Sequence, residues 1–437
     1  MLNLAVVGHT NTGKTSLMRT LLRDTQFGEV KNAAATTRHV EMAQIGDWLK
    51  LYDTPGLEDA GGVLDWLEEH TANKLDGIER IGQFLNSPAA QNEFSQEAKV
   101  LRQLLASDMA LYVIDAREPV LPKYKDELTV LSWCAKPIMP VFNFTQNGDL
   151  SAWQAMLARR LLHVSSSFDT VAFDFEGEMR LWDNLATMLP QRADLDDLMR
   201  MRQQEWRDLD RQAREIIAHF LLDVAAFRQQ FADKNQLENI QTQMQTAVRQ
   251  LERTTQQQIL ALYRFYQNEL HGEDWALQAF RQDPFDANLL KEYGIRTTRG
   301  AATGALIGLG LDALTAGLSL GMGMLLGGVI GGTVSNWRTL SDKMSGVKTV
   351  FIDAATITVL AARALDLLAV LQSRGHAAQD EMRLSGSRAP WQSDKLPEPL
   401  QKARVRQKWS VLNGTSSDVA QHLRHEKAQI LVEQYLR

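Results

Sequence analysis

The chain has 437 residues, of which 44% are hydrophobic and 23% are charged, and its formal net charge is −6. A chain of this length exceeds what one hydrophobic core holds, so two or three domains are expected, and the ordinary composition argues against wholesale disorder. Nucleic-acid-binding proteins usually carry an excess of positive charge, whereas this chain is negatively charged, so nucleic acid is not expected as a partner.

The first part of the chain has the pattern of an α/β domain. Short apolar runs alternate with helical stretches up to about residue 190, which is typical of a mostly parallel sheet with flanking helices. The predicted strands are Leu2–Val7, Arg38–Ile45, Trp48–Tyr52, Met109–Ile114, Ile138–Phe142 and Thr170–Phe173. We therefore predict a domain that spans residues 1–190.

A complete phosphate-loop motif, Gly8-His9-Thr10-Asn11-Thr12-Gly13-Lys14-Thr15, lies between the first strand and a helix. Backbone N–H groups of such a loop surround phosphates at a helix N-terminus, where the helix dipole also favours anions. Lys14 is expected to reach the β- and γ-phosphates, and the Thr15 hydroxyl to coordinate Mg²⁺. The residues expected to bind nucleotide here are Gly8, Asn11, Thr12, Gly13, Lys14, Thr15 and Ser16. The motif in this context predicts a nucleoside triphosphatase.

Two further motifs follow in the expected order. Asp53-Thr54-Pro55-Gly56 comes after a predicted strand, so Asp53 can hold the Mg²⁺ through water and the Gly56 amide can sense the γ-phosphate. Thr36-Thr37-Arg38 lies in a loop before a strand, where one threonine can complete the metal shell. Loss of the γ-phosphate would release both loops. The other interpretation of the threonine pair is a plain loop.

These motifs resemble the Era and TrmE branch of the translation-factor-related GTPases, and the whole chain resembles bacterial GTPases with an uncharacterised helical C-terminal domain. The resemblance rests on Gly8-x-x-Asn11-x-Gly13-Lys14-Thr15, Thr36-Thr37-Arg38 and Asp53-Thr54-Pro55-Gly56-Leu57. It implies a Ras-like fold that binds GTP or GDP with Mg²⁺ and hydrolyses GTP. The expected catalytic residues are Lys14, Thr37, Gly56 and Asn11, with Thr15, Thr37 and Asp53 at the metal.

The resemblance also bears on two individual positions. It places Leu57 where Ras-like enzymes have a glutamine that orients water, and a leucine cannot do this by hydrogen bonding. It implies that Asn11 helps to coordinate a K⁺ ion near the β- and γ-phosphates, which predicts hydrolysis stimulated by potassium. The alternative is that Asn11 only tolerates the backbone conformation of the loop.

The base-recognition motif departs from the pattern of these GTPases. The expected N-K-x-D is replaced by Asn143-Phe144-Thr145-Gln146 after a predicted strand. Asn143 is in place and Phe144 can cover the base, but Gln146 lacks the charge of the aspartate. Guanine selectivity is then weaker or comes from elsewhere, with Asp149 as one candidate. A literal Asn73-Lys74-Leu75-Asp76 is interpreted as a coincidence on a solvated helix.

Beyond residue 190 the strand pattern ends, and an all-α domain is predicted over residues 191–372. Apolar residues at three- and four-residue steps predict long helices over Leu195–Phe227 and Leu237–Phe265, and another helix over Val347–Leu371. The apolar faces of these helices are suited to packing in a hydrophobic core or to self-association. Residues 373–437 are predicted as a linker and a helical tail. The tail's basic cluster of Lys402, Arg404, Arg406 and Lys408 suits a solvated helix face, or alternatively anionic lipid or RNA.

A glycine-rich apolar segment spans residues 299–336, where Asp312 is the only charge between Arg299 and Arg338. The uncharged run Ala313–Val334 is long enough to span a bilayer as one helix, and small residues at four-residue spacing let helices approach closely. These features favour insertion into a membrane or peripheral contact with an anionic membrane surface. Its many glycines and Asp312 suit a tightly packed, buried helical hairpin. Both interpretations stay open.

The leading hypothesis is a GTPase switch that couples nucleotide state to a helical, membrane-associating domain. One alternative is a dynamin-like mechanochemical membrane protein, and another is an RNA or ribosome assembly GTPase. The last is weakened because no βααβ module with a G-x-x-G loop follows the GTPase domain. The single cysteine, Cys134, and an N-terminus without a signal-peptide pattern favour a cytoplasmic location, with peripheral attachment to the inner face of the membrane.

Overall fold

The computed structural model describes two compact units, which we call the N-terminal and C-terminal units. The N-terminal unit holds Met1–Trp206, and the C-terminal unit holds Arg207–Tyr263 with all described residues that follow. The described residues are 1–24, 27, 40–145, 149–170, 175–190, 192–231, 236–263, 282–286, 289, 292–295, 307–311, 348–372, 389–392, 395–414 and 418–437.

The N-terminal unit is built on a six-stranded sheet with the order β2-β3-β1-β4-β5-β6. Its strands are β1 (Leu2–Val7), β2 (Glu41–Ile45), β3 (Leu49–Asp53), β4 (Met109–Asp115), β5 (Ile138–Asn143) and β6 (Ser166–Ser167). Strand β2 runs antiparallel to β3, and the other pairings are parallel. The continuous apolar runs of β1 and β4 are buried, as expected for parallel strands with helices over both faces. The predicted Ras-like, mostly parallel α/β domain is therefore confirmed.

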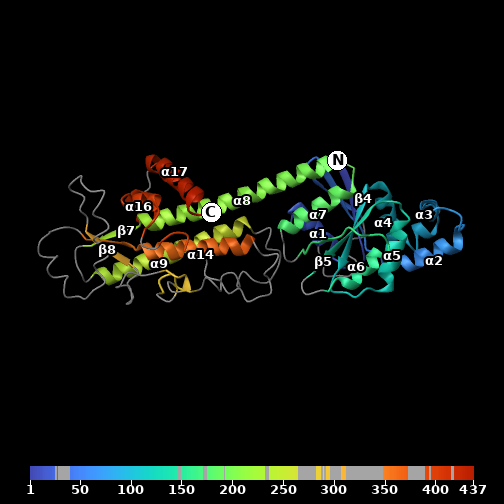
Figure 1. Ribbon diagram of the computed structural model, residues 1–437, viewed down its shortest axis with the longest axis horizontal. Coiled ribbons are helices and arrows are strands. Elements are labelled where there is room, and N and C mark those ends of the chain that lie inside the picture. The colour runs from blue at the N-terminus through green and yellow to red at the C-terminus, as the bar shows by residue number, and fades with distance from the viewer. Residues whose placement is uncertain are drawn as a thin grey trace. The chain divides into compact units, whose positions relative to one another are not determined.

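Helices cover both faces of this sheet, with α1 and α7 on one side and α4 and α5 on the other (Figure 1). The helices of this unit are α1 (Lys14–Leu22), α4 (Ser95–Ala106), α5 (Pro122–Ser132), α6 (Ser151–Ala158), α7 (Phe175–Met188) and the start of α8 (Arg192–Ala226). One apolar core joins Val7 and Tyr112 of the sheet to Leu101, Leu128 and Trp153 of the helices. Because β1, β3, β4 and β5 are parallel, the loops after them meet at one edge of the sheet.

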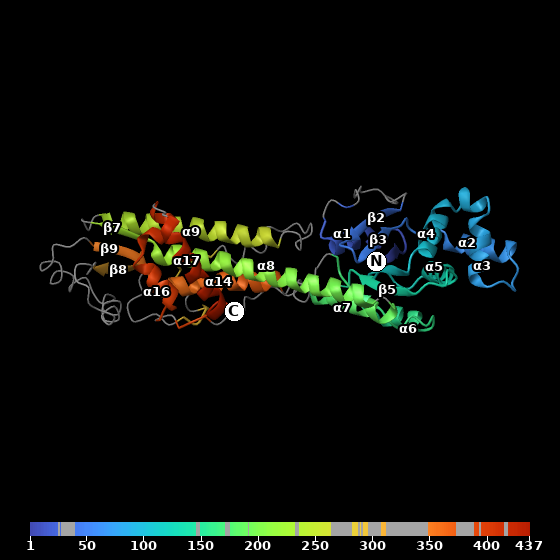
Figure 2. The same ribbon diagram turned by 90° about the horizontal axis from the view of Figure 1, so that it is seen from above.

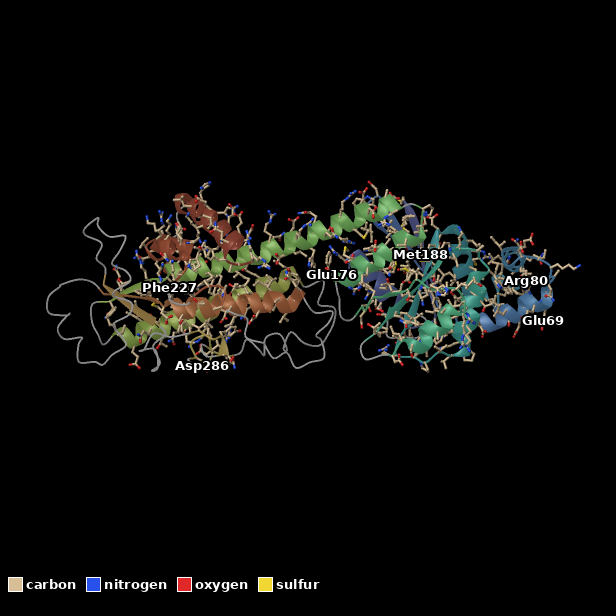
Figure 3. All side chains as sticks on the ribbon, in the orientation of Figure 1. Glu69, Arg80, Glu176, Met188, Phe227 and Asp286 are labelled. Carbon is tan, nitrogen blue, oxygen red and sulfur yellow. The ribbon has the colours of Figure 1, made fainter. Side chains whose placement is uncertain are left out.

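A helical extension follows the third strand and consists of α2 (Ala60–His70), α3 (Gly77–Leu85) and η1 (Ala89–Gln91). Figure 3 labels Glu69 and Arg80 in it. The Arg80 guanidinium donates to the Leu67 carbonyl at 2.8 Å and stacks on the Trp133 ring, so it ties α3 to α2 and α5. The Asn73-Lys74-Leu75-Asp76 sequence lies in the turn between α2 and α3, where Asp76 forms a capping box with Glu79. The prediction that it lies within a helix was wrong, because this capping pair begins a new helix.

The C-terminal unit is largely helical, as predicted. Its helices are the rest of α8, α9 (Leu237–Leu262), α14 (Ala354–Gln372), α16 (Glu398–Arg404) and α17 (Asp418–Gln434), with the short helices η4 (Gln407–Trp409) and η5 (Val411–Asn413). Helix α9 packs along α14 (Figure 2). Helices α8 and α9 correspond to the two long amphipathic helices expected from the periodicity of the apolar residues.

This unit also contains a sheet that the all-α prediction omitted. Strands β7 (Arg228–Phe231), β9 (Lys348–Ile352) and β8 (Ile307–Leu311) pair in that order, and both pairings are antiparallel. Residues 348–352 were expected to begin a helix, and residues 307–311 to lie in a helical hairpin. Periodicity cannot separate such short apolar runs from helix, and pairing with distant strands decides their structure. The remainder of 299–336 lies outside the described residues.

The sixth strand of the N-terminal sheet lies earlier in the chain than predicted. Ser166 and Ser167 pair with Val141 and Phe142 of β5, although serine has little preference for strands. Thr170 was expected to begin this strand, but its backbone N–H donates to the Asn143 side chain at 3.0 Å. Residues 171–173 lie outside the described residues. Tertiary pairing therefore overrides the apolar pattern here.

Candidate functional site

The loop between β1 and α1 has a backbone that only certain residues adopt. Gly8, Asn11 and Gly13 have φ values of 141°, 65° and 89°. A Cβ atom at Gly8 would lie 2.6 Å from the Val113 carbonyl oxygen, and one at Gly13 would lie 2.2 Å from Asn143 Nδ2. Glycine is therefore required at both positions, while asparagine is one of the few other residues that tolerate a left-handed conformation. The loop ends where α1 begins, at Lys14.

Lys14 is buried beneath this loop. Its Nζ donates to the carbonyls of His9 at 2.7 Å and Gly8 at 3.1 Å. Burial lowers the pKa of Lys14 to about 8, and nearby carboxylates, Asp53 first among them, act in the opposite direction. A cation held at a helix N-terminus, beside backbone N–H groups, can bind the terminal phosphates of a nucleotide.

Thr15 and Asp53 form the second part of the site. The Thr15 hydroxyl donates to Asp53 Oδ2 at 2.6 Å, and Asp53 is 1% exposed. Its other oxygen, Oδ1, is buried and has no hydrogen-bond partner among the described residues. Burial raises the pKa of Asp53 to about 6, and the Thr15 hydrogen bond opposes this shift. A hydroxyl beside a carboxylate with a free buried oxygen fits Mg²⁺, whose charge would favour the ionised carboxylate.

The segment after Asp53 folds back onto the phosphate loop. The Thr54 hydroxyl donates to the Val6 carbonyl at 2.8 Å, which joins this segment to β1. A Cβ atom at Gly56 would lie 2.2 Å from Thr10 Oγ1 and 2.8 Å from the Thr10 nitrogen. Gly56 thus lies against the phosphate loop. Thr37, the predicted switch threonine and third metal ligand, lies outside the described residues, as do Thr36 and Arg38.

Asn143, at the end of β5, joins the loop that follows this strand to the phosphate loop. Its side-chain amide donates to the Thr12 carbonyl at 3.0 Å, and its Oδ1 accepts from the backbone N–H groups of Phe144 and Thr170. This side chain is 0% exposed, so its three partners fix the loop after β5 against the phosphate loop. Asn143, which the sequence analysis singled out at the end of this strand, therefore contacts the phosphate loop directly.

Phe144 lies over the phosphate loop, with its ring atoms 3.2 to 3.4 Å from the place where a Gly13 Cβ would stand. The Arg117 guanidinium stacks on this ring at 4.0 Å and forms a bidentate pair with Asp115 at 2.6 and 2.9 Å. Gln146 lies outside the described residues. Asp149 accepts from the backbone N–H and hydroxyl of Ser151 at the start of α6, so its carboxylate serves this helix terminus.

Three residues of the site were not predicted. His9 contacts both the Leu57 carbonyl and the Glu127 carboxylate, and Thr10 donates to Glu58 at 2.8 Å. His9 and Thr10 fall at variable positions of the motif, so the motif is silent about them. Glu127 offered a signal, because helical spacing places this carboxylate on the same face as the apolar residues Leu128 and Leu131. A buried charge usually has a specific partner.

Two family models match the chain. A domain of unknown function (DUF3482) matches residues 154–433, and a 50S ribosome-binding GTPase model matches residues 3–144. Comparison with curated proteins gave no match.

Solved structures of GTPases also resemble the chain. Era in complex with MgGDPNP and a 16S ribosomal RNA segment is 18% identical over 42% of this chain and 55% of that chain, with a TM-score of 0.30. Aquifex aeolicus Era bound to GDP and AlF4⁻ is 19% identical over 44% and 58%, with a TM-score of 0.31. The G domain of the T. maritima FeoB iron transporter is 15% identical over 43% and 98%, with a TM-score of 0.27. The chain thus spans little more than half the length of either Era chain.

Proposed function

Because the chain belongs to the DUF3482 family and begins with a GTP-binding GTPase domain, we propose that it is a switch in which GTP hydrolysis controls its helical C-terminal region. The observation that carries this proposal is the contact of Thr15 with Asp53 at 2.6 Å, directly beside Lys14. These three residues supply one cation and two oxygen ligands around a loop shaped for phosphates.

The proposed roles follow from this geometry. Lys14 exchanges its carbonyl partners for the β- and γ-phosphates, and Thr15 and Asp53 hold Mg²⁺, with Thr37 as its third protein ligand. The metal would neutralise charge on the phosphate oxygens. Gly56 lies against Thr10, so its backbone N–H reports the γ-phosphate that arrives beside them. Asn11 is proposed to help bind K⁺ near these phosphates.

A route from the nucleotide to the helical region begins at the end of α1. There the Arg202 guanidinium of α8 donates to the Leu21 carbonyl at 2.7 Å, and Arg23 pairs with Glu178 of α7 and Glu205 of α8. Glu178 is 0% exposed and also pairs with Arg202 at 3.3 Å. Helix α8 then continues without a break from Arg192 to Ala226, which takes it into the C-terminal unit. A displacement of α1 on hydrolysis would be passed to α8 through these contacts.

The first experiment is competition for labelled GTP by GTP, GDP and ATP, together with phosphate release. The proposal expects GTP and GDP to compete at least about tenfold better than ATP, a difference of about 1.4 kcal/mol. Lys14→Ala is expected to abolish binding, while Lys125→Ala, on an exposed part of α5, should bind as the parent does. Unchanged binding and cleavage by Lys14→Ala would refute the proposal.

Coupling is tested separately by hydrogen exchange. Amides of α8 beyond residue 206 should exchange at different rates with GDP and with a GTP analogue. Arg202→Met should remove most of this difference while nucleotide still binds, because the variant cuts the link between α1 and α8. Equal exchange in both nucleotide states of the parent would show that α8 does not carry the signal.

We also propose peripheral membrane contact through residues 299–336, which the apolar, glycine-rich composition supports. Among the described residues, one helix, α14, is long and apolar enough to cross a membrane. It is mostly buried, and its Arg363 pairs with Glu252 of α9 at 2.7 Å, so it serves as a core helix. Sedimentation with anionic liposomes in GTP and GDP tests this proposal, and no binding in either state would reject it.

A further inference from the structure

The segment Leu57–Asp59, which directly follows Gly56, is held on two sides. The Leu57 N–H donates to the Gly8 carbonyl at 3.2 Å, and the N–H groups of Glu58 and Asp59 donate to Glu97 Oε1 at 3.3 and 3.1 Å. Glu97 is a buried residue of α4. The backbone beside the γ-phosphate position is therefore anchored to the phosphate loop and to the core.

His9 provides another anchor. Its Nδ1 lies 2.8 Å from the Leu57 carbonyl oxygen and 2.7 Å from Glu127 Oε1. Both neighbours accept hydrogen bonds, so Nδ1 carries the hydrogen and donates to them. His9 is a phosphate-loop residue, so its ring joins that loop to the segment after Gly56.

Neighbouring side chains of α5 and β4 fix the orientation of the His9 ring. Glu127 of α5 is 1% exposed, and its other oxygen accepts from the Tyr112 hydroxyl of β4 at 2.7 Å. The ring of Tyr124 meets the His9 ring edge to face at 5.8 Å between centroids. A buried carboxylate with two donors holds an imidazole in one orientation, as carboxylates do behind functional histidines elsewhere.

The identity of Leu57 indicates why this arrangement matters for hydrolysis. Its apolar side chain is fully buried and has no group that can orient water. The backbone of Gly56 and Leu57 supplies polar groups near the γ-phosphate position, and the neighbouring Glu58 carboxylate accepts a hydrogen bond from the Thr10 hydroxyl at 2.8 Å. We infer that His9 is a positioning residue for GTP hydrolysis, which holds the Leu57 carbonyl and thereby the Gly56 amide in place through the relay Tyr112, Glu127 and His9. The inference rests on the proposed GTPase function.

The test compares His9→Ala, which removes the donor, with His9→Asn, whose side-chain amide nitrogen restores an N–H donor on a side chain that branches at the same place. We expect His9→Ala to lower kcat about tenfold while the Kd values for GTP and GDP stay within about threefold, because the lost contact positions groups without binding nucleotide. His9→Asn should recover most of the kcat. His70→Ala, which changes an exposed histidine whose ring stacks on Trp66 of α2, should match the parent.

Three results would overturn the inference: an unchanged kcat in His9→Ala, a loss of kcat matched by an equal loss of affinity, or no recovery in His9→Asn. Should His9→Ala fail to fold, Tyr112→Phe takes its place, because it removes one hydroxyl from the relay and keeps the ring. It should lower kcat about threefold at unchanged affinity, and an unchanged kcat would again count against the relay. A parent protein that binds GTP without cleaving it would refute the proposed function and the inference with it, whereas the results above, in a parent that cleaves GTP, would refute the inference alone.

Discussion

Gly56 lies so close to Thr10 that a methyl group on its Cα would stand 2.2 Å from the Thr10 hydroxyl oxygen. This contact joins the segment after β3 to the phosphate loop, at the place where a γ-phosphate would arrive. The absence of a side chain at Gly56 is therefore a requirement of the site.

Gly56→Ala should weaken GTP binding at least about tenfold, while GDP binding changes less than about threefold, because the methyl group would displace the amide that we propose contacts the γ-phosphate, which GDP lacks. Isothermal titration with a GTP analogue and with GDP measures both values. Gly82→Ala is the matched control, since nothing lies within 4 Å of its added Cβ. The control should bind both nucleotides as the parent does, and equal losses for GTP and GDP in Gly56→Ala would contradict the assigned role.

Arg202→Met should destabilise the protein by about 2 to 3 kcal/mol, because it leaves the buried Glu178 carboxylate with one fewer cation. Unfolding in urea measures this change. Arg200 lies two residues earlier in α8 and pairs with Asp197, but its side chain is 75% exposed. Arg200→Ala should therefore stay within about 0.5 kcal/mol of the parent. A similar effect of the two substitutions would show that the buried pair adds nothing.

The proposed coordination of K⁺ by the Asn11 side chain can be tested separately from the left-handed backbone conformation of this residue. Asn11 has a φ of 65°, a conformation that glycine adopts without strain. Asn11→Gly therefore keeps the loop conformation and removes the amide. GTP hydrolysis by the parent should be several times faster in K⁺ than in Na⁺, and Asn11→Gly should lose this stimulation while it keeps its rate in Na⁺. Retained stimulation in the variant would assign Asn11 to the loop conformation alone.

His219 and Asp223 of α8 should oppose each other in the pH dependence of stability. Burial lowers the pKa of His219 to about 4, so its contribution to stability rises as the pH increases from 4 to its unfolded value of 6.5. Burial raises the pKa of Asp223 to about 6, while Arg424 opposes this shift. The contribution of Asp223 therefore falls as the pH increases from 3.8 to 6.

Substitution of either residue should reveal the contribution of the other to the pH dependence of stability. In urea unfolding between pH 4.5 and 6, Asp223→Asn should gain stability with rising pH more steeply than the parent, and His219→Gln should lose it. Each slope should differ from that of the parent by at most about 1.4 kcal/mol per pH unit, the effect of one proton. Parallel curves for all three proteins would mean that neither group titrates differently in the folded state.

Local patterns in the sequence determined much of the N-terminal unit. The residues from Gly8 to Thr15 specify a loop and a helix start by their own backbone preferences, and the apolar runs of β1, β4 and β5 could be read directly. Asp53 and Asn143 were predictable because each ends a strand, and parallel strands bring their carboxyl ends together. The long helices α8 and α9 followed from a period that each helix carries within itself.

Tertiary structure alone decided the features that depend on distant partners. Strand β9 pairs with β7, more than a hundred residues earlier, and Ser166 becomes a strand residue because β5 offers it a partner. His9 and Glu127 are 118 residues apart, and the packing of α5 against β4, where Glu127 meets Tyr112, brings them to 2.7 Å. Periodicity and backbone preference are properties of neighbouring residues, whereas a buried hydrogen bond depends on which side chains the packed core brings face to face.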